Sequence, residues 1–345
     1  MQWFIVPRLD GAISGGTLYN RLLIAGLKDS GCACDVLPID QAKAVLAKAH
    51  GNDGFWVDSL YLDRLPLLAR AARPGTRLGL IVHYLPSLIS RGEGIGAADL
   101  TPTEAAALRT AAMFLVPSPF MGGIVRRLVG SARPVLQIES GRPLAALVSL
   151  PGPPLRTLMV ANLVAGKGVE RFLPSLAEQI READDLCVSI VGGSEHDPAH
   201  AERCHDRQKD PRLRGRVRFL GELPHHETLQ EMAASNLLVS CSHMESYGMA
   251  LMEARVLGVP ILAQDGGHVA AMVERDSGGE LFADTDDLVA TMLRLGRDPV
   301  EHLRRMKLAR AGAWPARPWS AAAREFILLV QDLGTSRRED LCGVG

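Results

Sequence analysis

The sequence has 345 residues, of which 47% are hydrophobic and 5% are aromatic, so we expect two domains with aliphatic cores rather than one. Its 38 Lys and Arg residues against 39 Asp and Glu residues give a formal net charge of -1, which argues against a protein that grips nucleic acid through a basic face. The six cysteines are scattered without CxxC pairs, which argues against a disulfide framework or a zinc site and indicates reduced thiols.

Short apolar runs alternate with longer helical patterns through the first part of the chain. The pattern predicts a helix from about Thr17, directly after a Gly-Gly pair. Alternation of this kind is typical of a parallel, doubly wound sheet. Strands are predicted at residues 4–6, 34–37, 54–57, 78–82, 113–116 and 134–138.

The composition then changes at Leu150–Leu155, where three prolines remove backbone donors and fix φ. After this boundary the alternation restarts, which predicts a second Rossmann-like domain. The expected domains are residues 1–150, residues 151–315, and a C-terminal segment 316–345 whose helix, over 319–333, packs back on the first domain before a loose tail. Strands are predicted at residues 158–161, 187–191, 217–220, 237–240 and 260–263, and a helix at 249–257.

Two glycine-containing junctions between a strand and a helix are candidate anion sites. Gly15 and Gly16 precede the first helix, where exposed amides favour an anion, although an ordinary turn explains the pair equally well. Lys167 stands between two glycines after the strand at 158–161, so its ammonium group can reach a phosphate. Neither junction matches GxGxxG or GxxxxGK[ST], which lowers the expectation of a dinucleotide or P-loop enzyme.

The most informative junction is the segment from Glu245 to Glu253, which follows the strand ending at Ser240. Gly248 allows a tight turn, and the helix that starts at Met249 points its first amides at a ligand. Glu253 lies about one turn into that helix among apolar neighbours, where its carboxylate can accept hydrogen bonds from sugar hydroxyls.

Residues 155–300 resemble the nucleotide-sugar-binding domain of the retaining GT-B glycosyltransferases of family 4, whose two Rossmann-like domains face each other across a cleft. The two glutamates Glu245 and Glu253, with seven residues between them, match a paired-glutamate element of that family. Further matching features follow in the family's order: Gly15-Gly16, His83, Pro117–Phe120, Gly141, Lys167-Gly168, Ile190–Gly193, Val217–Gly221 and Asp265–Gly267.

The resemblance implies a role for each matched residue. Lys167 would bind the donor's diphosphate, Glu245 would meet the transferred sugar, and Glu253 would hold the ribose. His83 would contact the sugar from the N-terminal domain, with a hydrogen-bonded histidine at a strand end as the structural alternative. The donor-binding residues would be Gly15, Gly16, Lys167, Gly192, Gly248, Met249 and Glu253.

The implied activity is transfer of a sugar, with retention, from a nucleoside diphosphate sugar (a UDP-sugar favoured) to a hydroxyl of a glycan, a lipid or a small molecule. No cofactor is expected. Two positions depart from the family: Asn162 stands where an arginine is usual, and Ala270 stands where a glutamate is usual. These departures keep two alternatives open, a GT-B-fold sugar-nucleotide epimerase and a catalytically weak nucleotide-sugar-binding subunit.

No metal is expected either, since Asp284-Thr285-Asp286 precedes a predicted helix and reads as a cap rather than an Asp-x-Asp metal motif. The N-terminal apolar run is cut short by Pro7 and Asp10, so it does not read as a signal peptide. We therefore expect a cytoplasmic protein. Residues 120–133 predict either a surface helix with a buried apolar face or a peripheral contact with the inner membrane surface.

Overall fold

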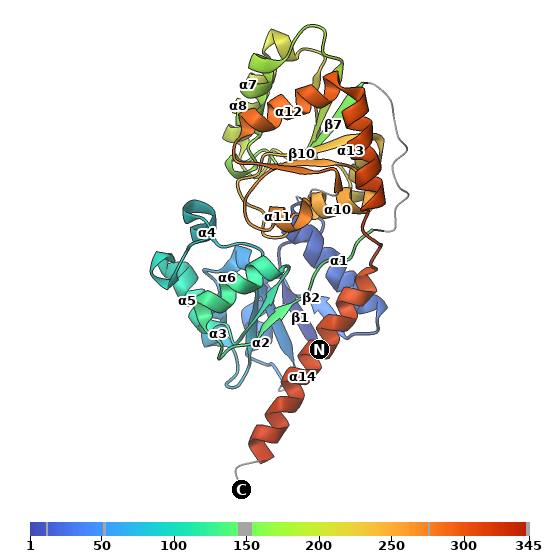
Figure 1. The fold of residues 1–345 in the computed structure, drawn as a ribbon. Coiled ribbons are helices and arrows are strands. Elements are labelled where there is room, and N and C mark those ends of the chain that lie inside the picture. The colour runs from blue at the N-terminus through green and yellow to red at the C-terminus, as the bar shows by residue number, and fades with distance from the viewer. Residues whose placement is uncertain (12, 51–52, 144–153, 275–276, 343–345) are drawn as a thin grey trace. The chain divides into compact units, whose positions relative to one another are not determined.

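A computed structural model describes residues 1–11, 13–50, 53–143, 154–274 and 277–342. The chain divides into two compact units. The first unit comprises Met1–Gly11, Gly16–Gly141 and Arg317–Gly345, and the second comprises Ala12–Gly15 and Arg142–Ala316. Each unit is built on one parallel six-stranded sheet with helices between its strands, shown as a ribbon in Figure 1. The predicted boundary at Leu150–Leu155 falls largely outside the described residues.

The sheet of the first unit has the strand order β2-β1-β3-β4-β5-β6, and all its pairings are parallel. Every residue of the two strands β4 and β5 is buried, because helices cover parallel strands on both faces. The six strands predicted from the sequence are confirmed, with small shifts at their ends. They are β1 (Gln2–Ile5), β2 (Cys34–Val36), β3 (Gly54–Asp58), β4 (Leu78–Ile81), β5 (Met113–Val116) and β6 (Val135–Gln137).

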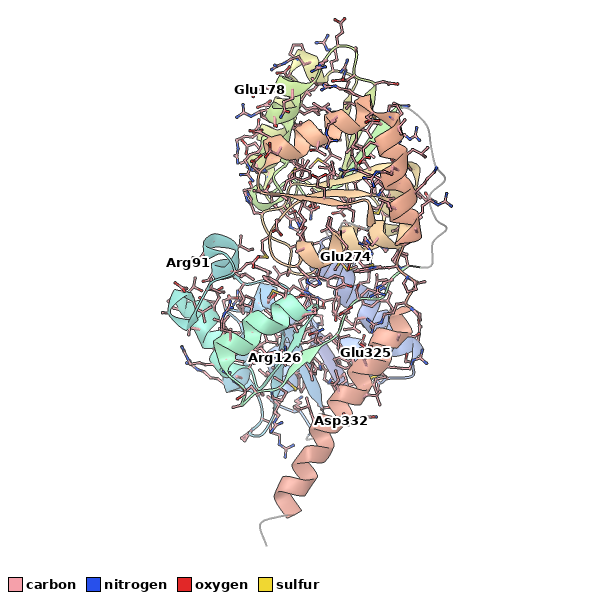
Figure 2. All side chains as sticks on the ribbon, in the orientation of Figure 1. Arg91, Arg126, Glu178, Glu274, Glu325 and Asp332 are labelled. Carbon is pink, nitrogen blue, oxygen red and sulfur yellow. The ribbon has the colours of Figure 1, made fainter. Side chains whose placement is uncertain are left out.

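Helix α6 (Pro119–Val129) settles which face of residues 120–133 is buried. Its first turn is capped by Ser118, whose Oγ accepts a hydrogen bond from the amide of Met121 at 3.1 Å. Ile124 and Val125 are buried with Met121, whereas Arg126, labelled in Figure 2, is exposed. The apolar face therefore packs inside the first unit, so these apolar residues are not available to enter a membrane. The remaining helices before the linker are α1 (Gly15–Asp29), α2 (Ile39–Leu46), α3 (Leu65–Ala71), α4 (Pro86–Arg91) and α5 (Pro102–Thr110), with 3-10 turns η1 (Ser59–Tyr61) and η2 (Ala97–Asp99).

Helix α14 (Trp319–Cys342) returns to the first unit. Phe326 lies in its core, with its ring 5.7 Å from that of Phe4 and 5.2 Å from that of Trp56. The helix continues to Cys342, beyond the end predicted at Leu333. The helix can run through Gly334, because one glycine costs a helix only about 1 kcal/mol and no proline follows it. The expectation of a loose tail stays a prediction.

The sheet of the second unit has the order β12-β11-β10-β7-β8-β9 and is also parallel. Five of its strands were predicted, although β7 begins earlier than expected. The edge strand β12 was missed, because Glu280-Leu281-Phe282 is too short to show a period. The strands are β7 (Leu155–Val160), β8 (Leu186–Val191), β9 (Val217–Gly221), β10 (Leu237–Ser240), β11 (Ile261–Gln264) and β12 (Glu280–Phe282).

Two apolar cores cover the two faces of this sheet. Leu237 and Val239 of β10 join the core that contains Phe172 and Met292, whereas the intervening Leu238 joins the core that contains Met252. Since all six strands are parallel, the segments after them leave the sheet at one edge, where ligands bind in such folds. The helices are α7 (Val169–Gln179), α8 (Pro198–Gln208), α9 (His225–Ala234), α10 (Met249–Leu257), α11 (Val269–Met272), α12 (Thr285–Arg297) and α13 (Pro299–Ala311), with 3-10 turns η3 (Ala165–Lys167) and η4 (Pro211–Leu213).

Candidate functional site

The loop between β10 and α10 is held in place by the loop that follows β11. Glu245 forms an isolated parallel bridge with Gly267, and its carbonyl oxygen accepts a hydrogen bond from the amide of His268 at 2.7 Å. Gly267 has φ +69°, and a Cβ there would lie 2.3 Å from the Glu245 carbonyl oxygen. Only glycine fits this contact, so the two loops fix the backbone from which the Glu245 side chain projects.

Lys167 and Glu245 form an ion pair across this edge of the sheet, with 2.5 Å between Nζ and Oε1. Lys167 ends the turn η3 after β7, and Glu245 follows β10, which is the neighbouring strand. Gly168, at φ +73°, packs so closely against the end of β10 that a Cβ would lie 2.2 Å from the carbonyl oxygen of Cys241. The strand order therefore brings together two predicted site residues that are 78 positions apart.

Helix α10 begins where predicted, because Gly248 takes the left-handed conformation with φ +86°. The first amides of a helix have no intrahelical partner, so the start of α10 is a place where an anion is stabilised. Gly15 belongs to the same unit, and a Cβ on it would lie 3.6 Å from Cγ of Met249. Three of the predicted donor-binding residues thus surround one helix N-terminus.

Glu253 lies in the second turn of α10 and is only 3% exposed. Its Oε1 is 2.6 Å from Nε2 of His225, the first residue of α9. Within the described residues, this carboxylate has no second hydrogen bond, so its other oxygen can still accept one. The sequence analysis missed His225; its only signal was a His-His pair directly after Pro224.

The loops after β7 and β8 are joined by Asn162, the residue that stands in place of the family's arginine. Its Oδ1 accepts from the amide of Gly193, and its Nδ2 donates to the carbonyl of Ile13, both at 2.9 Å. The amide of Ile13 in turn donates to Glu222 at 2.8 Å. Gly192 is confined, since a Cβ would lie 2.0 Å from the carbonyl oxygen of Ala161. Asn162 is therefore occupied in holding loops and supplies no positive charge.

In the first unit, His83 follows β4 and belongs to a buried polar chain. Its Nε2 is 2.9 Å from Oδ1 of Asn20, whose Nδ2 donates at 2.5 Å to Asp58, a residue that is 1% exposed. Burial lowers the pKa of His83, and the nearby Asp58 carboxylate opposes this shift without reversing it. A Cβ on Gly16 would lie 3.1 Å from the His83 ring. The ring is thus held beside the start of α1, and its burial favours the neutral form.

The structure gives the Asp284-Thr285-Asp286 segment a capping role. Asp284 is the N-cap of α12 and accepts a hydrogen bond from the amide of Asp287 at 2.9 Å. Across the described parts of the chain, no three or more His, Cys, Asp or Glu side chains are grouped as metal ligands would be. Likewise, no described helix has both the length and the apolar character that crossing a bilayer requires.

Two surface cavities in the described part of the second unit are not lined by Lys167, Glu245 or Glu253. One, of about 540 Å³, is lined by Gly278, Glu280 and Arg305 and lies at the amino end of β12, the edge opposite to the one that carries Glu245. The other, of about 460 Å³, lies between α7 and α12 and is lined by Glu178, labelled in Figure 2, among other charged residues. Ligand chemistry therefore has to be judged from the side chains at the carboxyl edge, not from cavity size.

Comparison with known sequences gives a family for part of the chain. Residues 148–311, a little under half of the chain, match the family model described as Glycosyl transferases group 1. The D-inositol 3-phosphate glycosyltransferase of Corynebacterium efficiens is 28% identical over 204 residues, which are 54% of this chain and 45% of that protein. A glycogen synthase of Mycobacterium tuberculosis is 27% identical over 173 residues, 49% of this chain and 41% of that protein. The chain spans about half the length of these curated relatives.

Comparison with solved structures covers nearly the whole chain. A sucrose-phosphate synthase from Thermosynechococcus elongatus aligns with a TM-score of 0.75 and 19% identity, over 97% of this chain and 99% of that one. The Anabaena protein Alr3699/HepE, in complex with UDP and glucose, aligns with a TM-score of 0.73 and 17% identity, over 96% and 99% of the two chains. These likenesses, together with the two parallel six-stranded sheets, show the GT-B fold and confirm the predicted fold class.

Proposed function

We propose that this chain is a retaining glycosyltransferase that moves a sugar from a nucleoside diphosphate sugar, with a UDP-sugar favoured, to an acceptor hydroxyl. The observation that carries the proposal is the pairing, at 2.5 Å, of Lys167, in the loop between β7 and α7, with Glu245, in the loop that leads to the N-terminus of α10. A partly exposed lysine and a set of helix amides at one edge of a sheet suit a diphosphate. The group 1 domain over residues 148–311 and the UDP bound by the Anabaena protein support the same donor class.

In the proposed reaction, the bond between the anomeric carbon and a diphosphate oxygen breaks, and a bond to the acceptor oxygen forms on the same face of the sugar. The proton of the acceptor hydroxyl passes to the departing diphosphate. Charge develops on the departing nucleoside diphosphate. Lys167 and the first amides of α10 stabilise that charge, because preorganised donors need no reorganisation during the step. This assignment needs no metal ion at the diphosphate.

Glu245 is proposed to position the transferred sugar rather than to attack it. Its carboxylate is held by Lys167 at 2.5 Å and is partly exposed, as a group that hydrogen-bonds to sugar hydroxyls must be. No second carboxylate partner is assigned to it, unlike the paired acids of retaining glycosidases. Lys167 exchanges this partner for the diphosphate when the donor binds.

The other predicted residues bind the ribose, the diphosphate or the transferred sugar. Glu253 binds the ribose, and Gly15, Gly192 and Met249 line the diphosphate with backbone groups. His83 contacts the transferred sugar, as the resemblance implies. Its neutral ring can donate and accept hydrogen bonds. The acceptor is a glycan, a lipid-linked glycan or a small molecule, and the protein acts in the cytoplasm, with peripheral membrane contact where the acceptor is a lipid.

A second candidate, a nucleotide-sugar-binding subunit with little turnover, is favoured by one observation. Asn162 uses both ends of its amide on Gly193 and Ile13, so the second cation usual in the resembled family is missing here. A cationic hydrogen bond of this kind is worth about 1.5–3 kcal/mol. Its loss lowers turnover more than binding if the charge matters most in the transition state.

A donor panel separates these functions. The purified full chain is incubated with UDP-, GDP- and ADP-sugars, with and without acceptor hydroxyls, and the products are resolved by NMR. Release of the nucleoside diphosphate with transfer or hydrolysis, and retention at the anomeric carbon, supports the transferase. Isomerised nucleotide sugar indicates an epimerase, and binding without turnover indicates the binding subunit. Absence of any binding contradicts the proposal.

A further inference from the structure

His225 makes the one described hydrogen bond to the buried carboxylate of α10, that of Glu253. Nε2 and Oε1 are 2.6 Å apart. Glu253 is 3% exposed, whereas the side chain of His225 keeps 21% of its surface. One side of the histidine thus reaches a buried acid while the other stays in contact with solvent.

The two residues lie at the edge of the sheet where the candidate site is. His225 opens α9, which follows β9, and Glu253 lies on α10, which follows β10 and packs against α9. At 1.5 Å per residue, Glu253 is about 7 Å along the helix axis from Gly248. This span is comparable with that from a diphosphate to the hydroxyls of its own ribose.

We propose that His225 is a positioning residue that fixes the Glu253 carboxylate for the ribose diol of the donor nucleotide. The inference rests on the proposed function, since it takes Glu253 to be the ribose ligand. His225 donates Nε2–H to Oε1, which leaves Oε2 to accept from the ribose. A hydrogen bond to an ionised acceptor is short and directional, so it restricts the carboxylate to one orientation.

The alternative, that His225 only stabilises the fold, fits the contacts less well. Helix α10 is anchored by Leu251, Met252 and Ala254, all at most 2% exposed, and does not depend on the histidine for packing. Burying a carboxylate without a hydrogen-bond partner lowers the stability of the fold, and the single donor of the partly exposed His225 offsets only part of that loss. A buried carboxylate with a single hydrogen-bond donor from the protein is expected where a bound ligand donates the remaining hydrogen bonds.

The test is the ratio of the affinities for UDP and 2′,3′-dideoxy-UDP, measured by titration calorimetry on the full chain. The unaltered chain should prefer UDP by about tenfold or more, the effect of one hydrogen bond to a charged group. His225→Ala and His225→Asn should reduce the preference to about twofold or less, because neither side chain reaches Oε1. His225→Gln should retain it, since its amide nitrogen lies at the same distance along the side chain as Nε2.

Controls separate this inference from a loss of fold and from failure of the proposed function. His226→Ala alters the exposed neighbour, whose ring is 3.8 Å from Glu227, and should leave the ratio unchanged. If His225→Ala does not fold, as judged by thermal unfolding, the Asn and Gln variants decide the question. If UDP binds with full preference in the Ala or Asn variant, the inference is overturned and the proposed function stands. If neither UDP nor GDP nor ADP binds the unaltered chain, both are overturned.

Discussion

Glu104 in the first unit and Glu253 in the second are both buried carboxylates on helices, but their surroundings differ. Glu104 is fully buried and accepts four hydrogen bonds, two each from Ser87 and Thr101, at 2.5–2.8 Å. Glu253 has one described partner, Nε2 of His225. The first acid joins α4 to the start of α5, whereas the second lies on the helix that follows the loop of Glu245.

The difference is the one expected between a structural acid and an acid that binds a ligand, which is the role proposed for Glu253. Burial opposes ionisation of Glu104, but the hydrogen bonds from Ser87 and Thr101 outweigh it and lower the pKa of that carboxyl. A carboxylate whose lone pairs are already used inside the protein has nothing left for a ligand. Glu253 keeps an oxygen available, so the free energy that would have gone into stability is available for binding.

The largest expected effect is on stability. Glu104→Gln should lower the free energy of unfolding by about 3 kcal/mol, because an amide nitrogen replaces one accepting oxygen, which leaves at least one of the four donors unpaired and removes the charge that strengthens the other hydrogen bonds. Unfolding in urea, followed by circular dichroism, measures this loss. UDP affinity should stay within about twofold, and a large drop in that affinity would show that the first unit's acid is not purely structural.

The same substitution tests how the free energy of unfolding depends on pH. Since folding lowers the pKa of Glu104, its contribution to stability is present above the ordinary glutamate pKa and is lost as the pH falls through the folded value. The unaltered chain should therefore lose more stability than Glu104→Gln between pH 5 and the acid limit of folding. Equal losses in the two proteins would contradict this account of the carboxylate.

For Glu253→Gln we expect the reverse pattern. UDP affinity should fall by about 1.5 kcal/mol, roughly tenfold, because the ribose loses an ionised acceptor. The free energy of unfolding should change by less than about 1 kcal/mol, since only His225 loses a charged partner. Calorimetry and urea unfolding on the same sample check both numbers. A stability loss as large as that of Glu104→Gln, with unchanged affinity, would remove the distinction between the two acids.

A smaller effect is expected at the helix N-terminus. Gly248→Ala should lower the free energy of unfolding by about 1 kcal/mol, because φ at this position is +86°. It should weaken UDP binding by a similar amount, because the new Cβ would lie 3.1 Å from the Leu251 side chain and shift the first amides of α10. Gly215→Ala is the matched control in the same unit: its φ is +74°, and no atom lies within 4 Å of its Cβ position. Equal UDP affinity in the two variants would argue against a phosphate at the start of α10.

The smallest effect concerns the ion pair. Glu245→Gln should raise the affinity for UDP, which carries no sugar, by about 0.5 kcal/mol, because Lys167 no longer exchanges a carboxylate for the diphosphate. The magnitude is small, since both side chains are partly exposed and such pairs contribute little. Weaker UDP binding in this variant would show that Glu245 itself contacts the nucleotide.

The sequence predicted the bounds of an element correctly where glycine or proline marks its ends. The glycines at positions 248 and 258 bound α10, and both have positive φ, so the predicted helix 249–257 is confirmed residue for residue. The strand β12 was missed, because a short edge strand carries little periodic signal, and α14 runs beyond its predicted end, because the ends of helices are the least predictable part of them.

The candidate site was predicted as residues but not as contacts. The pairing of Lys167 with Glu245 depends on β7 and β10 being neighbours, which local patterns do not encode. His225 was missed, because it meets Glu253 across 28 positions and two helices. The hydrogen bond from Asn162 to Ile13 could not be predicted either, because residues 12–15 belong to the second unit although the chain around them belongs to the first.

The most direct test of the central claim is the release of nucleoside diphosphate from the donor sugar that the panel identifies, followed for the unaltered chain, Lys167→Ala and Lys209→Ala. Lys209 is an exposed lysine of the same unit, paired with Asp206 at 2.7 Å, and controls for the loss of one charge. The proposed function predicts that the unaltered chain and Lys209→Ala release the nucleoside diphosphate at similar rates, while Lys167→Ala releases it far more slowly. Equal rates in all three proteins would contradict it.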